Sequence, residues 1–109
     1  MTAEEVLWAL RDWFGQVSAA GLKLPSGWFG RPYDNLHRLS SAQLIADRLT
    51  IVLDEQMILM LARPTAVRYR NGNLVISGFD HCVWDWREYG SGQPHLETFV
   101  KGEIEFVKP

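Results

Sequence analysis

The segment at residues 57–62, MILMLA, is apolar at every position. Successive side chains of a strand point to opposite faces, so a strand built from this segment is apolar on both sides. Strands of this kind are typical of sheets that are covered on both faces. We expect the N-terminal helix to cover one face, while the other needs a long loop, a closed barrel or a second copy of the chain. The last alternative predicts a homodimer.

The N-terminal helix is predicted by a capping box formed by Thr2 and Glu5. Apolar residues follow it at helical spacing and predict one core-facing stripe, made of Val6, Leu7, Leu10, Trp13, Phe14 and Val17. Trp8 lies outside the stripe, among charged residues, so it is either covered by a neighbouring loop or exposed. We expect the helix to fray after Phe14, with Gly21 available as a left-handed C-terminal stop.

Two hairpins are predicted in the middle of the chain. Asn71 and Gly72 form the strongest short hairpin signal, because both residues tolerate positive φ, and they join strands within residues 65–79. Residues 48–53 and 56–62 read as two strands around Asp54 and Glu55. Residues 44–52 also fit a helix, and periodicity alone does not decide between these alternatives.

The C-terminal part predicts further strands. Residues 81–89 form a strand in which Cys82, Trp84 and Trp86 share the inner face, and residues 95–107 form a closing strand pair. A chain of 109 residues has the usual size of one domain, residues 1–109. The predicted fold class is α+β: one N-terminal helix packed on a curved antiparallel β-meander or partial barrel.

Charge and cysteine content indicate which partners and which compartment to expect for this protein. The net charge of −2 and the pI near 5.9 do not indicate nucleic-acid or membrane-surface binding through net charge. Cys82 is the only cysteine, so no intrachain disulfide forms and a reducing cytoplasm is expected. Two acids stand where a signal peptide carries positive charge, and no apolar run approaches the roughly 20 residues that span a bilayer.

No set of residues predicts catalysis, a cofactor or a metal site. His81 and Cys82 are neighbours on a strand and point to opposite faces, so Cys82 reads as a buried structural cysteine. His37, His81 and His95 match no metal-ligand spacing. The arginines at positions 63, 68 and 70 read either as a basic stripe or as a solvated face.

The segment at residues 27–35 has an unusual composition, with glycines and aromatic residues around Arg31. We expect residues 22–35 to form a loop without regular structure, because glycine and proline disfavour it there. The candidate binding residues in and after this loop are Trp28, Arg31, Tyr33, Asp34 and His37. An arginine framed by aromatic rings is typical of binding surfaces. The same loop is also suited to act as a structural lid on the sheet.

These observations support two hypotheses about function. The first is a non-catalytic partner-binding module of the bacterial cytoplasm, such as an immunity-type or accessory protein, in which exposed Trp8 and the aromatic loop contact a protein partner. The second is a small-molecule or anion-binding domain, possibly enzymatic, with a pocket under the loop, Arg31 as anion clamp, and His37 or Asp34 as acid or base.

Overall fold

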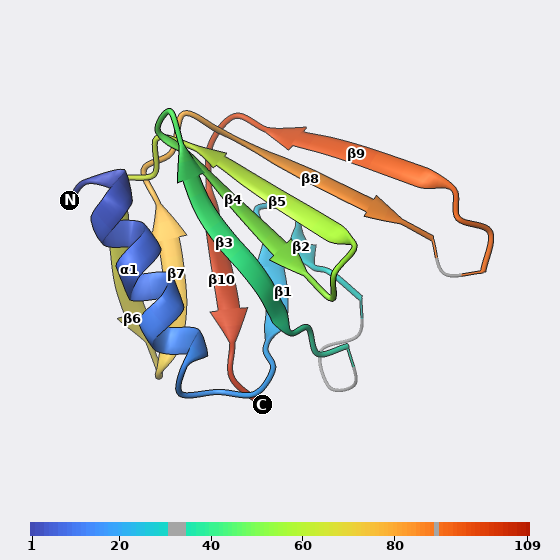
Figure 1. The fold of residues 1–109 in the computed structure, drawn as a ribbon, viewed down its shortest axis with the longest axis horizontal. Coiled ribbons are helices and arrows are strands. Elements are labelled where there is room, and N and C mark those ends of the chain that lie inside the picture. Colours follow the sequence, from blue (N-terminus) through green and yellow to red (C-terminus); the bar gives the residue numbers. More distant parts are fainter. Residues whose placement is uncertain (31–34, 89) are drawn as a thin grey trace.

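The structure is a computed structural model that describes residues 1–30, 35–88 and 90–109. One helix precedes ten strands, which form two five-stranded sheets. Figure 1 shows the helix at one side of the sheets. The predicted α+β class, with one N-terminal helix packed on antiparallel strands, is confirmed. The strands form two sheets with separate edges, and no closed barrel is formed by the described residues.

The helix, α1 (Ala3–Phe14), begins at the predicted capping box. The Thr2 side chain accepts from the Glu5 backbone N–H, and the Glu5 carboxylate accepts from the Thr2 N–H. The core-facing residues Val6, Leu7, Leu10, Trp13 and Phe14 are buried as expected, whereas the sixth residue of the predicted stripe, Val17, lies beyond the helix and is only partly buried. The helix ends after Phe14, as predicted, but its C-cap is Gly15 in a right-handed conformation. The prediction that Gly21 stops the helix is wrong, because Gly21 begins a strand.

The first sheet has the strand order β2-β1-β10-β7-β6, with all neighbours antiparallel. Its members are β1 (Gly21–Leu24), β2 (Gly27–Trp28), β6 (Ala66–Arg70), β7 (Asn73–Ser77) and β10 (Glu103–Val107). The expectation of an irregular loop at residues 22–35 is therefore wrong for its first half. Pro25 lies in the tight turn between β1 and β2, where its missing N–H leaves no ladder bond unmade.

The second sheet has the order β3-β4-β5-β8-β9, again antiparallel. Its members are β3 (Leu39–Ile45), β4 (Arg48–Leu53), β5 (Met57–Ala62), β8 (His81–Arg87) and β9 (Pro94–Phe99). The two predicted central hairpins are confirmed as β4–β5 and β6–β7. The helical alternative for residues 44–52 is excluded, because β3 and β4 form a hairpin there.

The two C-terminal strands do not pair with each other as predicted. β9 pairs with β8 in the second sheet, whereas β10 crosses to the first sheet and lies between β1 and β7. Gly102, with φ near 123°, lies between them, where the chain changes sheets. The two sheets thereby share one buried cluster, which also includes the inner residues of α1.

The two faces of β5 differ in burial. Leu59 and Leu61 on its inner face are fully buried, whereas Ile58 on its outer face is 38% exposed. The expectation that α1 covers one face of this strand is wrong: α1 lies alongside β3, β4, β6 and β7, and the inner face of β5 belongs to the core shared by the two sheets. The outer face remains open in the single chain.

The capping box provides a direct test of the helix terminus. We expect Thr2→Ala to lower the free energy of unfolding by about 1 kcal/mol, because the Glu5 N–H loses its acceptor. Urea unfolding followed by circular dichroism measures this change. Thr2→Ser keeps the hydroxyl and is the control, which we expect to stay within a few tenths of a kcal/mol of the parent. Equal stability of all three proteins would contradict this role of Thr2.

Candidate functional site

The structure describes three of the predicted site residues, and these lie on different elements. Trp28 is on β2, partly exposed, with the Lys23 ammonium 5.1 Å from its ring centre. His37 is only 3% exposed, and Trp8 is on the outer side of α1. Arg31, Tyr33 and Asp34 lie outside the described residues. The predicted anion clamp therefore remains a prediction, and the structural evidence in this region begins with Phe29 and His37.

Phe29 directly follows β2 and packs against rings of the second sheet. Its backbone N–H donates to the Leu22 carbonyl, which continues the β1–β2 pairing. Its ring lies 4.9 Å from the Trp84 ring, 5.0 Å from the Trp86 ring and 5.6 Å from the His37 ring, measured between centroids. We call these four residues the Phe29 cluster. The first sheet's hairpin thus meets the second sheet through this aromatic contact.

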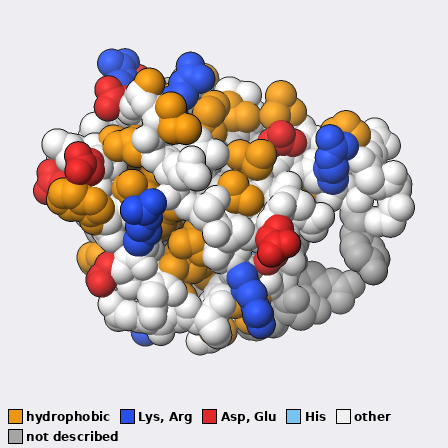
Figure 2. Space-filling view, in the orientation of Figure 1, with side chains coloured by type: hydrophobic (Ala, Val, Ile, Leu, Met, Phe, Trp, Pro, Cys, Tyr) orange, Lys and Arg blue, Asp and Glu red, His pale blue; other side chains and the backbone are white. Residues whose placement is uncertain are grey.

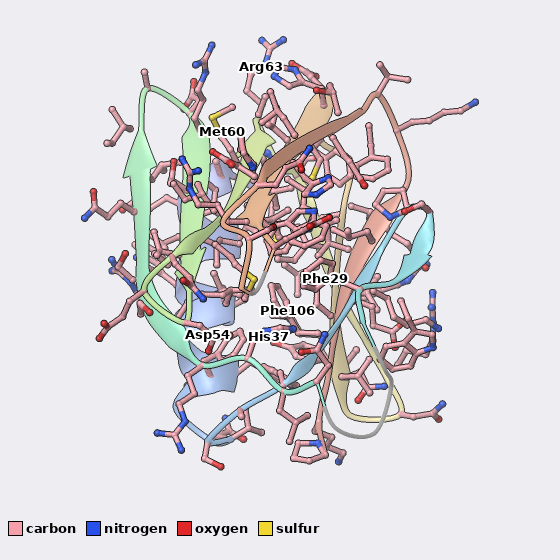
Figure 3. The ribbon with its side chains drawn as sticks, turned by 90° about the vertical axis from the view of Figure 1, so that its right-hand side faces the viewer. Phe29, His37, Asp54, Met60, Arg63 and Phe106 are labelled. Atoms are coloured by element: carbon pink, nitrogen blue, oxygen red, sulfur yellow. The ribbon has the colours of Figure 1, made fainter. Side chains whose placement is uncertain are left out.

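His37 is held in the cluster by both its backbone and its ring. Its backbone N–H and carbonyl pair with those of Ala20. Its Nδ1 lies 2.8 Å from Asp54 Oδ2, while Asp54 Oδ1 accepts from the Arg38 backbone N–H at 2.9 Å. Figure 3 shows His37 beside Asp54, with Phe29 nearby. The carboxylate that orients His37 is therefore Asp54, from the β4–β5 turn.

Sequence reasoning missed this partner of His37. Asp54 appeared only as a turn residue, and the two residues are 17 positions apart. The turn itself was a usable signal, since Asp54 stands directly after β4, in which alternate residues are buried. Its side chain is thereby directed from the strand end, where a carboxylate can meet a residue of a neighbouring segment.

The Phe29 cluster contains an unusual concentration of unpaired polar atoms. Among the described residues, three buried side-chain nitrogens have no hydrogen-bond partner: His37 Nε2, Trp84 Nε1 and Trp86 Nε1. All three belong to rings that contact Phe29. By contrast, the indole of buried Trp13 donates to the Gly72 carbonyl at 2.9 Å. An unmet buried polar group costs about 1–3 kcal/mol, so three together are a substantial fraction of a domain's stability.

The cluster continues toward the surface through His95. The His95 ring stacks on Trp86 at 4.4 Å, with an angle of 12° between the planes. His95 Nε2 lies 2.8 Å from Glu88 Oε1, and Glu88 Oε2 accepts from the Ser91 hydroxyl. These two hydrogen bonds, that from His95 first, lower the pKa of Glu88. Two histidine–carboxylate pairs, one buried and one at the surface, therefore flank the tryptophans.

Cys82 lies on the same inner face and is fully buried, as predicted. Burial raises the pKa of its thiol to about 12. Because the thiolate is the nucleophilic form, a thiol with this pKa is almost entirely unreactive near neutral pH. The neighbouring Asp80 forms an ion pair with Arg63 instead of joining a catalytic set. Cys82 therefore acts as a small core residue.

A second candidate surface lies between α1 and β3. It is a groove of about 560 Å³, which we call the α1–β3 groove, and it is lined by Glu4, Leu7, Trp8, Arg11, Gln43, Leu44 and Ile45. Trp8 is 57% exposed and Ile45 is 63% exposed. Figure 2 shows hydrophobic and charged side chains side by side over this part of the molecule. The expectation that Trp8 is covered or exposed is thus resolved in favour of exposure.

The predicted basic stripe is paired with acids. Arg68 forms an ion pair with Glu103, and Arg70 pairs with both Glu103 and Glu105, with nitrogen–oxygen distances of 2.8 and 3.0 Å for Arg70. These contacts join the edge strand β6 to β10 across β7 on the outer face of the first sheet. Of the two alternatives for these arginines, the paired surface fits the structure better than an open cationic stripe.

Comparisons with protein-family models, with curated proteins and with solved structures found no match. Among the described residues, no helix has the length and apolar character that a membrane span needs. The same part of the chain contains no group of three or more histidine, cysteine, aspartate or glutamate side chains arranged to hold a metal ion. The function must therefore be argued from the Phe29 cluster and the α1–β3 groove themselves.

The buried histidine–aspartate pair can be tested by removing the charge of Asp54. We expect Asp54→Asn to lower the free energy of unfolding by about 2 kcal/mol, because an NH2 group replaces one of the two oxygens that accept separately from His37 and from the Arg38 N–H. Asparagine tolerates the positive φ at this position, so the turn is retained.

The matched control is Glu55→Gln, a neighbouring exposed residue in the same turn that also has positive φ. We expect its stability to stay within about 0.5 kcal/mol of the parent. Chemical denaturation of the three proteins at pH 7 measures both changes. Similar effects of the two substitutions would show that the pair with His37 is unimportant for folding.

Proposed function

We propose that the protein is a non-catalytic binding protein of the bacterial cytoplasm, of the immunity or accessory type, that docks a protein partner in the α1–β3 groove. The observation that carries this proposal is the exposure of Trp8 and Ile45 on opposite walls of one groove. Large apolar side chains exposed together, rimmed by charges, are typical of interaction sites. Tryptophan is also among the residues that dominate binding energies.

The helix and β3 present these walls for different reasons. Trp8 faces outward because the helical period places it away from the buried stripe of α1. Ile45 ends an edge strand, directly before the β3–β4 turn, so only one side of its strand is paired. The Arg11 guanidinium donates to the Ala42 carbonyl on this edge and joins the two walls. This hydrogen bond fixes the two walls of the groove relative to each other in the free protein, so a partner does not have to form it.

The charge of the helix favours a basic partner. Glu4, Glu5 and Asp12 are exposed on α1, and Glu4 lines the groove beside Arg11, whose guanidinium is engaged with the Ala42 carbonyl. Complementary charge increases the rate and specificity of association. We therefore infer that the partner inserts an apolar side chain between Trp8 and Ile45 and carries lysine or arginine beside it.

Peptide display against the purified protein tests this docking mode. We expect the selected peptides to carry an apolar residue flanked by lysine or arginine, and to bind more weakly at high salt. Trp8→Ala should weaken their binding about thirtyfold, which corresponds to a hot spot of about 2 kcal/mol. Tyr69→Ala removes an exposed aromatic residue on β6 and is the matched control. Isothermal titration calorimetry measures the affinities.

Two results would contradict the proposal. One is selection of peptides that bind the Trp8→Ala protein as tightly as the parent. The other is selection of acidic peptides whose binding does not weaken with salt, since these would not be recognised by the acidic helix face.

We also propose that the open outer face of the second sheet joins two copies of the chain. Ile58 and Leu96 lie on this face on either side of Asp85, and Leu96 is 69% exposed. Arg48 is on the same face, since it precedes buried Leu49 on β4. A two-fold dimer through this face brings the same surface of both copies together, and this surface carries both an acid, Asp85, and a base, Arg48, which favours a second copy as the occupant.

Light scattering at tens of micromolar protein tests this homodimer. We expect a dimer for the parent and a monomer for Ile58→Lys, because an unpaired ammonium within an apolar interface is strongly unfavourable. Tyr69→Lys places the same charge on the other sheet and should remain dimeric. A monomeric parent at this concentration would exclude the dimer.

A second candidate function is the binding of a small molecule near the segment at residues 27–35. The three unpartnered ring nitrogens of the Phe29 cluster favour it. This function does not depend on the α1–β3 groove, which is built from other residues.

A further inference from the structure

We propose that the partner enters the α1–β3 groove in an extended conformation and adds a strand to the edge of β3. This proposal rests on the proposed function and specifies the form of its partner. Exposed sheet edges bind extended peptides in this way, because backbone hydrogen bonds supply affinity and alternate side chains supply specificity. Two features of β3 support it: its unprotected edge and the direction of its backbone groups.

β3 is the least protected of the four edge strands of the two sheets. Exposed edges pair with other chains unless short strands, charges or prolines prevent it. β2 has only two residues, β6 carries Arg68 and Arg70, and β9 begins with Pro94. β3 reads LSSAQLI, without a charged residue or a proline. Its edge is therefore suited to receive a further strand.

The pairing of β3 with β4 decides which backbone groups of β3 face the groove. A two-residue turn joins the strands, and Ile45 is paired with the first residue of β4. The pair that closes such a turn is hydrogen-bonded, and bonded and non-bonded pairs alternate along an antiparallel ladder. Gln43 therefore bonds to β4, whereas the backbone N–H and C=O groups of Ala42 and Leu44 point away from it.

Arg11 closes this edge at Ala42 and leaves it open at Leu44. The Arg11 guanidinium donates to the Ala42 carbonyl, which agrees with the direction deduced for this residue. Leu44 lies further along the groove wall, and among the described residues no other segment forms a backbone hydrogen bond with it. One residue of an antiparallel strand forms both missing hydrogen bonds, and every pair in this sheet is antiparallel.

The alternation of side chains along the added strand defines its sequence. The side chain opposite Leu44 points to the inner side of the sheet, where Leu7 and Trp8 line the groove. Its two neighbours point to the outer side, where Ile45 is exposed. Figure 1 shows that α1 and β3 run in opposite directions, so Glu4 lies toward the end of β3. A lysine two residues before the central apolar residue therefore points toward Glu4.

The blocked peptide acetyl-TKVLVTT-amide has this pattern and is a suitable probe, with leucine opposite Leu44. We expect it, at millimolar concentration, to slow hydrogen exchange of the Leu44 amide at least about tenfold, measured by NMR on the unaltered ¹⁵N-labelled protein. The Gln43 amide is the internal control, because it bonds to β4 with or without the peptide.

Methyl groups on the peptide backbone test the hydrogen bonds directly. A methyl group on the leucine nitrogen removes the donor to the Leu44 carbonyl and should weaken binding about tenfold. The same methyl group on the nitrogen of the following valine faces away from β3, so binding should stay within about twofold of the parent peptide. Isothermal titration calorimetry measures the three affinities.

The outcomes separate strand addition from groove docking in general. Binding that is lost with Trp8→Ala but leaves the exchange of Leu44 unchanged, or that weakens equally with either methyl group, would overturn strand addition and leave the proposed function intact. Protection of Leu44 that persists in Trp8→Ala would support strand addition and contradict the role of Trp8.

Two further results would overturn the inference. The first is the absence of peptide binding at millimolar concentration. The second is protection of Leu44 that rises with protein concentration without peptide, since this would show that a second copy of the chain occupies the edge.

Discussion

The packing of two apolar sheet faces around one core is the constraint on which the rest of the structure depends. Each sheet buries one face, and the inner residues of β4, β5 and β8 meet those of β1, β7 and β10 in one cluster. Such a pair of sheets needs cover at its open sides. In Figure 1, α1 covers one side, and β2 lies on the side away from that helix.

The two covers differ in how they satisfy polar groups. At α1 the buried indole of Trp13 donates to Gly72 in the β6–β7 turn, so the helix and hairpin are joined by a complete hydrogen bond. At Phe29 the indoles of Trp84 and Trp86 are buried without such a partner among the described residues. The unmet polar groups of the core are therefore concentrated at the Phe29 cluster, whereas the indole beside the helix is satisfied. The α1–β3 groove instead depends on exposed apolar area and on the charge of the helix. The Phe29 cluster and the α1–β3 groove thus differ in the chemical groups that they offer.

Several elements were predictable because their causes are local. The capping box at Thr2 and Glu5 starts α1, and Asn71-Gly72 makes the β6–β7 turn. β3 was missed because its turn is formed by Ala46 and Asp47, both with positive φ, and alanine is an unusual residue in that conformation. β1 and β2 were missed because Pro25 suggested a loop, although it occupies only the turn between them. Of the candidate site, His37, Trp84 and Trp86 were noticed separately, but Asp54 was not, since no local signal connects it with His37.

The sequence by itself determined the helix and its buried stripe, the position of Trp8 outside that stripe, the four strands of the two central hairpins and the burial of Cys82. These follow from capping, turn chemistry and periodicity, which act over a few residues. Only the tertiary structure decided that β9 and β10 belong to different sheets, that Asp54 orients His37 and that Phe29 joins three rings from distant segments. Those features depend on contacts between residues that are far apart in the chain. The alternation of side chains along a strand shows which of its faces is apolar, but it does not show which other element will cover that face.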